Sequence, residues 1–210
     1  MKRTGIVADP IFLEHVAPRY HPETERRLEA IYGRIEASGL GEKLSRIPLR
    51  RADGDEIALV HERAHIERVE SLSGADVHLD ADTYMSARSP EVARYAAGGA
   101  IDLVKGILAG DLDNGFALVR PPGHHAEADR GMGFCVYNNI AIAAMAAVEV
   151  HGLERVMIMD WDLHHGNGTQ HSFYDDDRVL YASTHQYPFY PGTGGVQEVG
   201  RRRGEGYTVN

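Results

Sequence analysis

The feature that most constrains the fold is the segment Arg155–Gly168, RVMIMDWDLHHGNG. Its apolar run, Val156–Met159, contains β-branched residues and is followed directly by a cluster of polar ones. This pattern is typical of a buried parallel strand whose carboxyl end carries a site, where open α/β sheets bind their ligands. Gly166 and Gly168 then allow a tight turn into a helix that we expect to start within Thr169–Phe173.

The polar cluster has a spacing that suits a metal ion. Side chains alternate along extended backbone, so Asp160, Asp162 and His164 are expected to project to one side. A carboxylate and an imidazole two residues apart on one face suit zinc. The alternative interpretation is an ordinary strand end with solvated polar residues and a capping aspartate.

The rest of the chain alternates predicted strands and helices. Gly98-Gly99 indicates close packing of one helix on a neighbour, and Gly74–Ser89 is turn-rich, which predicts a surface loop. The βαβα order predicts one domain, residues 1–210, of the α/β class, with a parallel sheet and helices on both faces. Besides the strand that precedes Asp160, we expect strands at 4–8, 116–119 and 179–183 and helices at 21–38, 90–109 and 138–150.

Composition excludes several classes of protein. Twenty-two basic against 31 acidic residues give a net charge of −9, which argues against a nucleic-acid partner and favours cationic ligands. The longest apolar run, Ile140–Val148, is far shorter than the roughly 20 residues of a membrane span, so we expect no membrane partner. The single cysteine, Cys135, fits a reducing compartment and a cytoplasmic location.

Histidines cluster at a second predicted strand end. His124 and His125 follow the strand at 116–119, so polar residues near His124, Asp162 and Ser183 could converge. A neutral imidazole can act as a general base if a carboxylate or amide orients it, and Asp160 and Asn167 are the candidates. With zinc-bound water as nucleophile, these groups predict metal-assisted hydrolysis of an amide. As an alternative, adjacent histidines are often loop residues bonded to backbone.

A different zinc motif competes with this interpretation. His61-Glu62-Arg63-Ala64-His65 matches the H-E-x-x-H pattern of zinc proteases, which needs one continuous helix. Here the apolar stripe before His61 is rotated away from the stripe after His65. Two short helices with a break near His61 explain the sequence better, although a zinc protease remains one hypothesis.

The motifs together resemble a known family. Arg120–Gly133, Asp160–Gly168 and Tyr190–Gly194 are similar to the zinc-dependent histone deacetylases, in the form of class II-type and bacterial members such as acetylpolyamine amidohydrolases. His21-Pro22-Glu23 and Gly133-Phe134-Cys135 belong to the same pattern. The resemblance runs from about residue 5 to the end and implies the arginase–deacetylase fold. The arginase branch needs an Asp where this chain has Gly166, which favours a single zinc over two manganese ions.

The resemblance implies roles for particular residues. Asp162 and His164 would be two of three zinc ligands, and Arg27 would lie near an internal acetate channel. The catalytic histidines would be His124, as general base, and His125, which would assist the leaving amine; Asp160 and Asn167 would orient them, and Gly133, Phe134 and Tyr190 would line the acyl-lysine channel. A structural K⁺ would use Asp160, Asp162, His164, Ser183 and Thr184, and a second cation Phe173, Asp176 and Val179.

The chain departs from the family pattern at its carboxyl end. Family members take a third zinc ligand, an Asp, and a catalytic Tyr from segments beyond the position of Asn210. We therefore expect the amino-terminal portion of a deacetylase domain, cut inside a strand, with weak or no activity on acetyl-lysine or acetylated polyamines. A non-catalytic metal-binding or acyl-lysine-binding module is the alternative.

Overall fold

The computed structural model describes residues 3–210. The strands are β1 (Thr4–Val7), β2 (Leu44–Arg46), β3 (Val77–His78), β4 (Tyr84–Met85), β5 (Asn114–Ala117), β6 (Val156–Asp160), β7 (Val179–Ser183) and β8 (Thr208–Val209). The α-helices are α1 (Arg26–Ala37), α2 (Gly54–Ile57), α3 (Arg63–Ser71), α4 (Ser89–Leu108), α5 (Asn139–Glu149) and α6 (Asn167–Phe173). Short 3-10 helices are η1 (Pro10–Glu14), η2 (Leu40–Lys43) and η3 (Arg202–Gly204).

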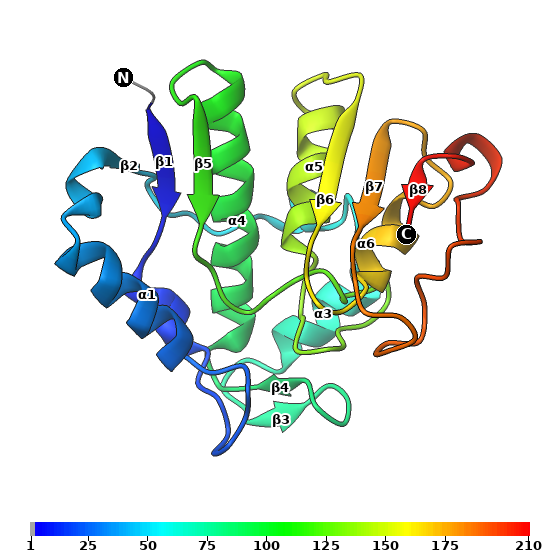
Figure 1. The fold of residues 1–210 in the computed structure, drawn as a ribbon. Helices are drawn as coiled ribbons and strands as arrows, with labels where there is room; N and C mark the ends of the chain where they lie inside the picture. The colour runs from blue at the N-terminus through cyan, green and yellow to red at the C-terminus, as the bar shows by residue number, and fades with distance from the viewer. Residues whose placement is uncertain (1–2) are drawn as a thin grey trace.

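Two parallel sheets form the framework (Figure 1). Their strand orders are β2-β1-β5 and β6-β7-β8, and every pairing within them is parallel. The pairing of Asp160 with Ser183 sets the ends of β6 and β7 level with each other. Among the described residues β5 and β6 do not pair, so the chain has two short sheets where we expected one. The α/β class and the parallel arrangement are confirmed.

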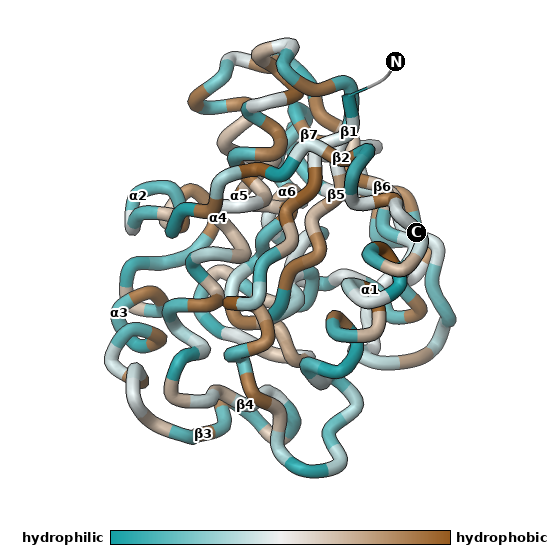
Figure 2. Tube along the Cα trace, turned by 90° about the vertical axis from the view of Figure 1, so that its left-hand side faces the viewer, coloured by the Kyte–Doolittle hydropathy of each residue, from teal (hydrophilic) through white to brown (hydrophobic). Residues whose placement is uncertain are grey.

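Helices lie on both faces of the strands, as predicted. Figure 2 shows α3, α4 and α5 to one side of the strands and α1 to the other. Helix α4 packs closely on its neighbours at two glycines: a Cβ at Gly98 would overlap the backbone of Arg50, and one at Gly99 would overlap Val7. The expected close packing at Gly98-Gly99 is therefore confirmed, and it places α4 directly against β1.

Three predicted elements differ from the structure. The first helix begins at Arg26 rather than at His21, and the strand expected at 116–119 is β5, two residues earlier in the chain. The predicted surface loop Gly74–Ser89 contains the antiparallel hairpin β3–β4. Tyr84 and Met85 of that hairpin are buried. The Tyr84 hydroxyl donates to the buried carboxylate of Glu23, and the Met85 side chain packs in the hydrophobic core around α4.

Strand β6 is buried on one face only, so the prediction of a buried parallel strand holds for that face and not for the other. Ile158 is 7% exposed, whereas Met157 and Met159 are 60% and 43% exposed. Phe116 of β5 is also exposed, and no described element covers this face of the two strands. A four-residue apolar run does not distinguish one covered face from two, because alternate residues point to opposite sides.

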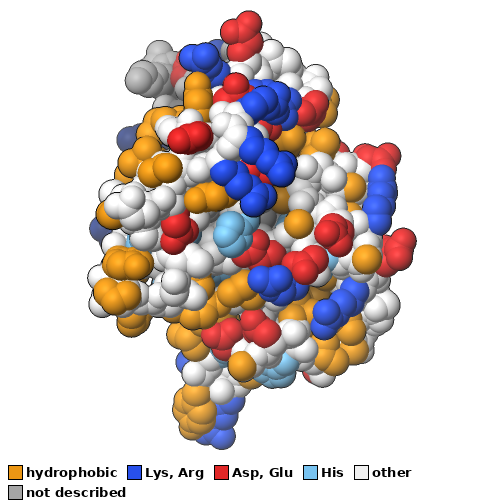
Figure 3. Space-filling model, turned by 90° about the vertical axis from the view of Figure 1, so that its right-hand side faces the viewer, with side chains coloured by type: hydrophobic (Ala, Val, Ile, Leu, Met, Phe, Trp, Pro, Cys, Tyr) orange, Lys and Arg blue, Asp and Glu red, His pale blue; other side chains and the backbone are white. Residues whose placement is uncertain are grey.

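Charged side chains of both signs are interspersed on the face seen in Figure 3. Arg201 and Arg202 lie near Asp175, and Arg203 lies near Asp177. This face therefore presents no continuous basic surface of the kind that binds nucleic acid. Within residues 3–210, no helix combines the length and the apolar character that crossing a bilayer requires.

Candidate active site

The predicted site residues converge near the carboxyl ends of β5, β6 and β7, which point the same way in Figure 1. A cavity of about 510 Å³ opens there. The segments that follow the three strands are each predicted to carry functional residues. The cavity brings together those that follow β5 and those that follow β6. Its lining includes Pro22, Glu23, Arg27, Asp82, Pro122, His124, His125, Gly133, Phe134, Asp162, Leu163, His164, Phe189 and Tyr190.

His124 is oriented by Asp160. The imidazole Nδ1 donates to Asp160 Oδ2 over 2.9 Å, and Asp160 also accepts from the Tyr181 hydroxyl and from the backbone N–H of Asp162. Burial raises the pKa of the Asp160 carboxyl, but the hydrogen bond and charge of His124 outweigh it, so the net pKa lies below the ordinary value. A Cβ at Gly166 would overlap this carboxylate, so only glycine permits the contact.

His125 is held by a different partner. Its Nδ1 lies 2.8 Å from Asn167 Oδ1, and its ring lies 4.0 Å from that of His124, centroid to centroid. Burial, and then the neighbouring His124, lowers the pKa of His125 to about 4, so this imidazole is neutral at physiological pH. Asp160 and Asn167 are the two orienting residues that the sequence indicated, and the structure pairs Asp160 with His124 and Asn167 with His125.

Asp162 and His164 are the predicted zinc ligands, and they lie side by side. His164 Nδ1 is 3.2 Å from Asp162 Oδ1, and both side chains are partly exposed to the cavity. A carboxylate and an imidazole suit zinc in kind, but a catalytic site normally has three protein ligands. No group of three metal-binding side chains exists among residues 3–210. The residues present therefore fit two of the three protein ligands of a zinc site and no more.

Other residues do not complete this metal site. The Asp176 carboxylate pairs with Arg178 at 2.6 Å. The ring of His185 bonds to the Ser183 hydroxyl and to the carbonyl of Gly194. Both side chains are thus engaged elsewhere.

Nothing in the structure tests the predicted monovalent cations, so they stay predictions. At the first predicted cation site, the backbone N–H of Thr184 donates to the carbonyl of Asp160. Ser183, at the end of β7, is the register partner of Asp160, at the end of β6. At the second predicted cation site, Phe173 is buried and its carbonyl accepts from the N–H of Asp176. Val179 follows three residues after Asp176, at the start of β7.

Aromatic side chains form the walls of the cavity. Tyr190 packs edge-on against His125, with ring centroids 5.1 Å apart, and Phe189 stacks on His164 at 5.4 Å. Phe134 has a positive φ of 71°, and its backbone N–H donates to the Thr83 hydroxyl. The predicted channel residue Gly133 also has a positive φ, and a Cβ there would overlap the ring of His125.

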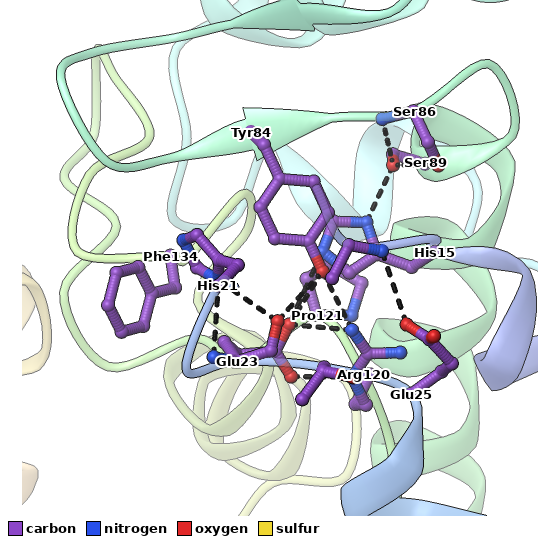
Figure 4. Close-up of polar contacts among 12 residues, drawn as sticks. His15, His21, Glu23, Glu25, Tyr84, Ser86, Ser89, Arg120, Pro121 and Phe134 are labelled. Atoms are coloured by element: carbon purple, nitrogen blue, oxygen red, sulfur yellow. Dashed lines mark hydrogen bonds and ion pairs between the residues drawn. The ribbon is translucent and has the colours of Figure 1, made fainter. Parts of the chain in front are cut away.

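A buried ionic group lies beneath the cavity (Figure 4). Arg120 donates from Nε and Nη2 to the two carboxylate oxygens of Glu23, at 2.5 and 2.7 Å, and Tyr84 donates its hydroxyl to the same carboxylate at 2.8 Å. Burial raises the pKa of Glu23, but Arg120 outweighs it and the net pKa is lowered. His21 packs edge-on against both Tyr84 and Phe134, so this group supports the channel wall. Arg27 lines the same cavity, 3.9 Å from Glu23.

The H-E-x-x-H segment does not form a metal site. The break between α2 and α3 places His61 before the helix that contains His65, as predicted. His61 donates to the carbonyl of Glu127 and accepts from the N–H of Asn138, while His65 Nε2 lies 3.0 Å from the carbonyl of Val136. Both histidines are buried and bonded to backbone, which is a structural role.

Sequence reasoning missed several residues of the site. Glu127 contacts Asn167, Thr83 holds Phe134, and Phe189 stacks on His164. Phe189 directly precedes the predicted Tyr190, so the aromatic character of its loop was a usable signal. Glu127 and Thr83 belong to no recognisable chemical motif, and only the tertiary structure brings them to the site.

Comparison with known proteins identifies the family. The model of the histone deacetylase domain matches residues 21–210. A probable deacetylase of Archaeoglobus fulgidus is 41% identical over 209 residues, covering 99% of this chain and 58% of the relative. Histone deacetylase 9 of Homo sapiens is 38% identical, with 99% and 24% covered, and histone deacetylase 15 of Arabidopsis thaliana is 45% identical, with 90% and 35% covered.

A solved structure agrees with this result. The crystal structure of the HDA15 HD domain superposes with a TM-score of 0.96 at 41% identity, covering all of this chain and 61% of that one. The chain spans between about a quarter and three fifths of the length of these relatives. Because the family model matches nine tenths of the chain, and the fold agrees throughout, this protein belongs to the histone deacetylase domain family.

Proposed function

We propose that this chain carries most of the active site of a zinc-dependent deacetylase, which hydrolyses the acetyl amide of acetyl-lysine or of an acetylated polyamine. One observation carries the proposal. His124 and His125, each bonded to its own orienting residue, lie in one aromatic-walled cavity with the potential zinc ligands Asp162 and His164. A general base, a Lewis-acid site and a channel for an extended acyl chain are the parts that amide hydrolysis requires.

The proton chemistry follows from the hydrogen bonds of the two histidines. Because the Asp160 carboxylate can only accept, His124 carries its proton on Nδ1 and has a free lone pair on Nε2. That lone pair accepts a proton from the attacking water, and Asp160 stabilises the imidazolium that results. His125 is neutral and lies beside His124, where it assists proton transfer to the leaving amine. Zinc, when bound at such a site, lowers the pKa of water.

The two-ligand metal site implies weak zinc binding and feeble catalysis by the 210-residue chain. Catalytic zinc sites normally have three protein ligands, and this chain offers Asp162 and His164. A structural K⁺ at the Asp160–Ser183 level remains part of the proposal.

The acidic character of the chain favours a cationic substrate. The net charge is −9, and Asp82, which forms no salt bridge with a lysine or arginine among residues 3–210, lines the cavity together with Phe134. A polyamine or a lysine-rich peptide would be attracted to this rim, whereas a nucleic acid would be repelled. A cytoplasmic location, inferred from the single buried cysteine, fits either substrate.

The direct test is acetate release from an acetyl-lysine peptide, with the zinc-supplemented chain in excess over the peptide. We expect slow release that Asp162→Ala and His124→Ala abolish, while Glu67→Gln, on the exposed face of α3, leaves it unchanged. Zinc retained without any acetate release would instead favour the binding-module alternative. A rate equal to that of the Archaeoglobus relative would contradict the two-ligand account.

A further inference from the structure

Behind His125, polar side chains form a continuous path from the cavity to the surface. Asn167 Oδ1 lies 2.8 Å from His125 Nδ1, and Asn167 Nδ2 donates to Glu127 Oε1 at 2.5 Å. On its other side, Glu127 accepts from His171 Nδ1, which lies 2.9 Å from both carboxylate oxygens. Glu127 and Asn167 are 7% and 3% exposed, while His171 is half-exposed.

Glu127 determines which way the Asn167 amide faces. Burial raises the pKa of Glu127, but the hydrogen bonds from His171 and Asn167 outweigh it and the net pKa is lowered, so the side chain is an ionised acceptor. A carboxylate of this kind requires donors. The Asn167 NH₂ group is the donor that faces it, and the same group lies 3.3 Å from the carbonyl of His125.

The amide orientation in turn sets the tautomer of His125. With its NH₂ directed to Glu127, Asn167 presents its oxygen to His125, so the histidine proton lies on Nδ1 and the Nε2 lone pair is free. If the amide were reversed, the NH₂ would face Nδ1 and the proton would move to Nε2. An aspartate has two equivalent oxygens and needs no such control, whereas an asparagine does.

We propose that Glu127 is a positioning residue that fixes the Asn167 amide and, through it, the Nδ1–H tautomer of His125, with His171 as its outer partner. The loop that carries Glu127 is itself held in place. His61 donates to the Glu127 carbonyl, and Glu62 N–H donates to the carbonyl of the next residue. The importance of the tautomer for catalysis rests on the proposed function; the tautomer itself does not.

The test is ¹⁵N NMR of histidine-labelled, metal-free chain, at a pH well above the His125 pKa of about 4. The His125 resonances are assigned from their loss in a His125→Gln spectrum. In the wild type we expect the Nδ1–H tautomer alone. We expect Glu127→Leu to give a substantial fraction of the Nε2–H tautomer, and Glu127→Gln to restore Nδ1–H because its amide oxygen can still accept from Asn167.

A double variant separates positioning from general damage. Combining Glu127→Leu with Asn167→Asp should return His125 to the Nδ1–H tautomer, since the new carboxylate needs no orientation. Glu67→Leu, an exposed glutamate on α3, is the matched control and should leave the His125 signals unchanged. If Glu127→Leu does not fold, the wild-type Asn167 side-chain amide still gives a result: one of its protons should resonate downfield, as expected for a short bond to a carboxylate.

Two results would overturn the proposal. One is an unchanged Nδ1–H tautomer in Glu127→Leu, and the other is an ordinary amide shift for Asn167 in the wild type. Neither depends on zinc or on turnover. A chain that shows the predicted tautomers but releases no acetate would refute the proposed function and leave this inference standing.

Discussion

At the scale of single residues, the site depends on charges that are buried and fully paired. The Arg120 guanidinium and the Glu23 carboxylate lie together under the cavity, and both are almost inaccessible to water. Such a pair adds little net stability by itself, but removing one partner leaves the other charge buried and uncompensated. The group therefore constrains the conformation of the channel wall more than it stabilises the fold.

This leads to a prediction for Glu23. We expect Glu23→Ala to lower the free energy of unfolding by about 3–5 kcal/mol, because it strands the Arg120 charge. Urea denaturation followed by circular dichroism measures the change. Glu67→Ala, at an exposed position, should cost less than about 0.5 kcal/mol. A Glu23→Ala cost as small as this would mean that Arg120 finds water or another partner.

Local chemistry was predictable from sequence where one segment carries the whole signal. Asp160, Asp162 and His164 lie within five residues, so strand periodicity predicted that they share one side, although β6 ends at Asp160 and the other two follow it on a bend. Tyr84 and Glu127 were missed because their partners lie far along the chain, 61 residues from Tyr84 to Glu23 and 40 from Glu127 to Asn167. Only tertiary packing creates such contacts.

At the scale of elements, close backbone approach positions the helices against the strands. At Gly98, in the middle of α4, the backbone of Arg50–Ala52 passes so near that no Cβ fits. The sequence predicted this packing from the Gly98-Gly99 pair. It could not predict that β5 and β6 do not pair with each other among residues 3–210, since periodicity identifies strands but not their neighbours.

Two glycine substitutions test this packing in opposite directions. Gly98→Ala should lower the free energy of unfolding by about 1–3 kcal/mol, since a methyl group would displace backbone atoms. Gly33→Ala, on the exposed face of α1 with nothing within 4 Å, should raise it by about 0.5–1 kcal/mol. Thermal and urea unfolding give both values. A neutral Gly98→Ala would refute the close contact.

At the scale of the whole molecule, buried neutral histidines couple folding to pH. Burial is the main cause that lowers the pKa of His15 to about 3 and that of His61 and His125 to about 4, from an ordinary 6.5. At pH values between the lowered pKa of each histidine and 6.5, the unfolded chain therefore binds more protons than the folded chain. Stability contributed by these groups is complete above pH 6.5 and is lost as pH falls toward 4.

The prediction is a free energy of unfolding that falls steadily between pH 6.5 and about 4.5, before most carboxylates titrate. Each such histidine adds up to about 1.4 kcal/mol per pH unit to the slope. His61→Gln should reduce this slope by up to about 1.4 kcal/mol per pH unit, because the unfolded chain then takes up one proton fewer on acidification. His171 acts in the opposite direction: its hydrogen bond to Glu127 raises its pKa, so its stabilising contribution is full below the unfolded pKa of 6.5 and is lost as pH rises. A slope unchanged in His61→Gln would contradict the assignment.

The exposed apolar face of β5 and β6 is a second whole-molecule property. Phe116, Met157 and Met159 lie beside two strand edges that have no partner among residues 3–210, which favours edge-to-edge association. We expect concentration-dependent self-association, measured by sedimentation velocity, that Met157→Lys reduces. Val16→Lys, at an apolar residue exposed outside the sheets, should have no effect. A monomer at all concentrations would refute this.

The central claim is that Asp162 and His164, next to the two oriented histidines, form the metal site. Zinc bound per chain, measured by competition with a chromophoric chelator, tests it most directly. We predict one weakly held zinc that Asp162→Ala and His164→Ala each remove, whereas His124→Ala and the double variant His61→Gln/His65→Gln retain it. Zinc that survives loss of Asp162 and His164 but disappears with His61 and His65, or with His124, would contradict the account.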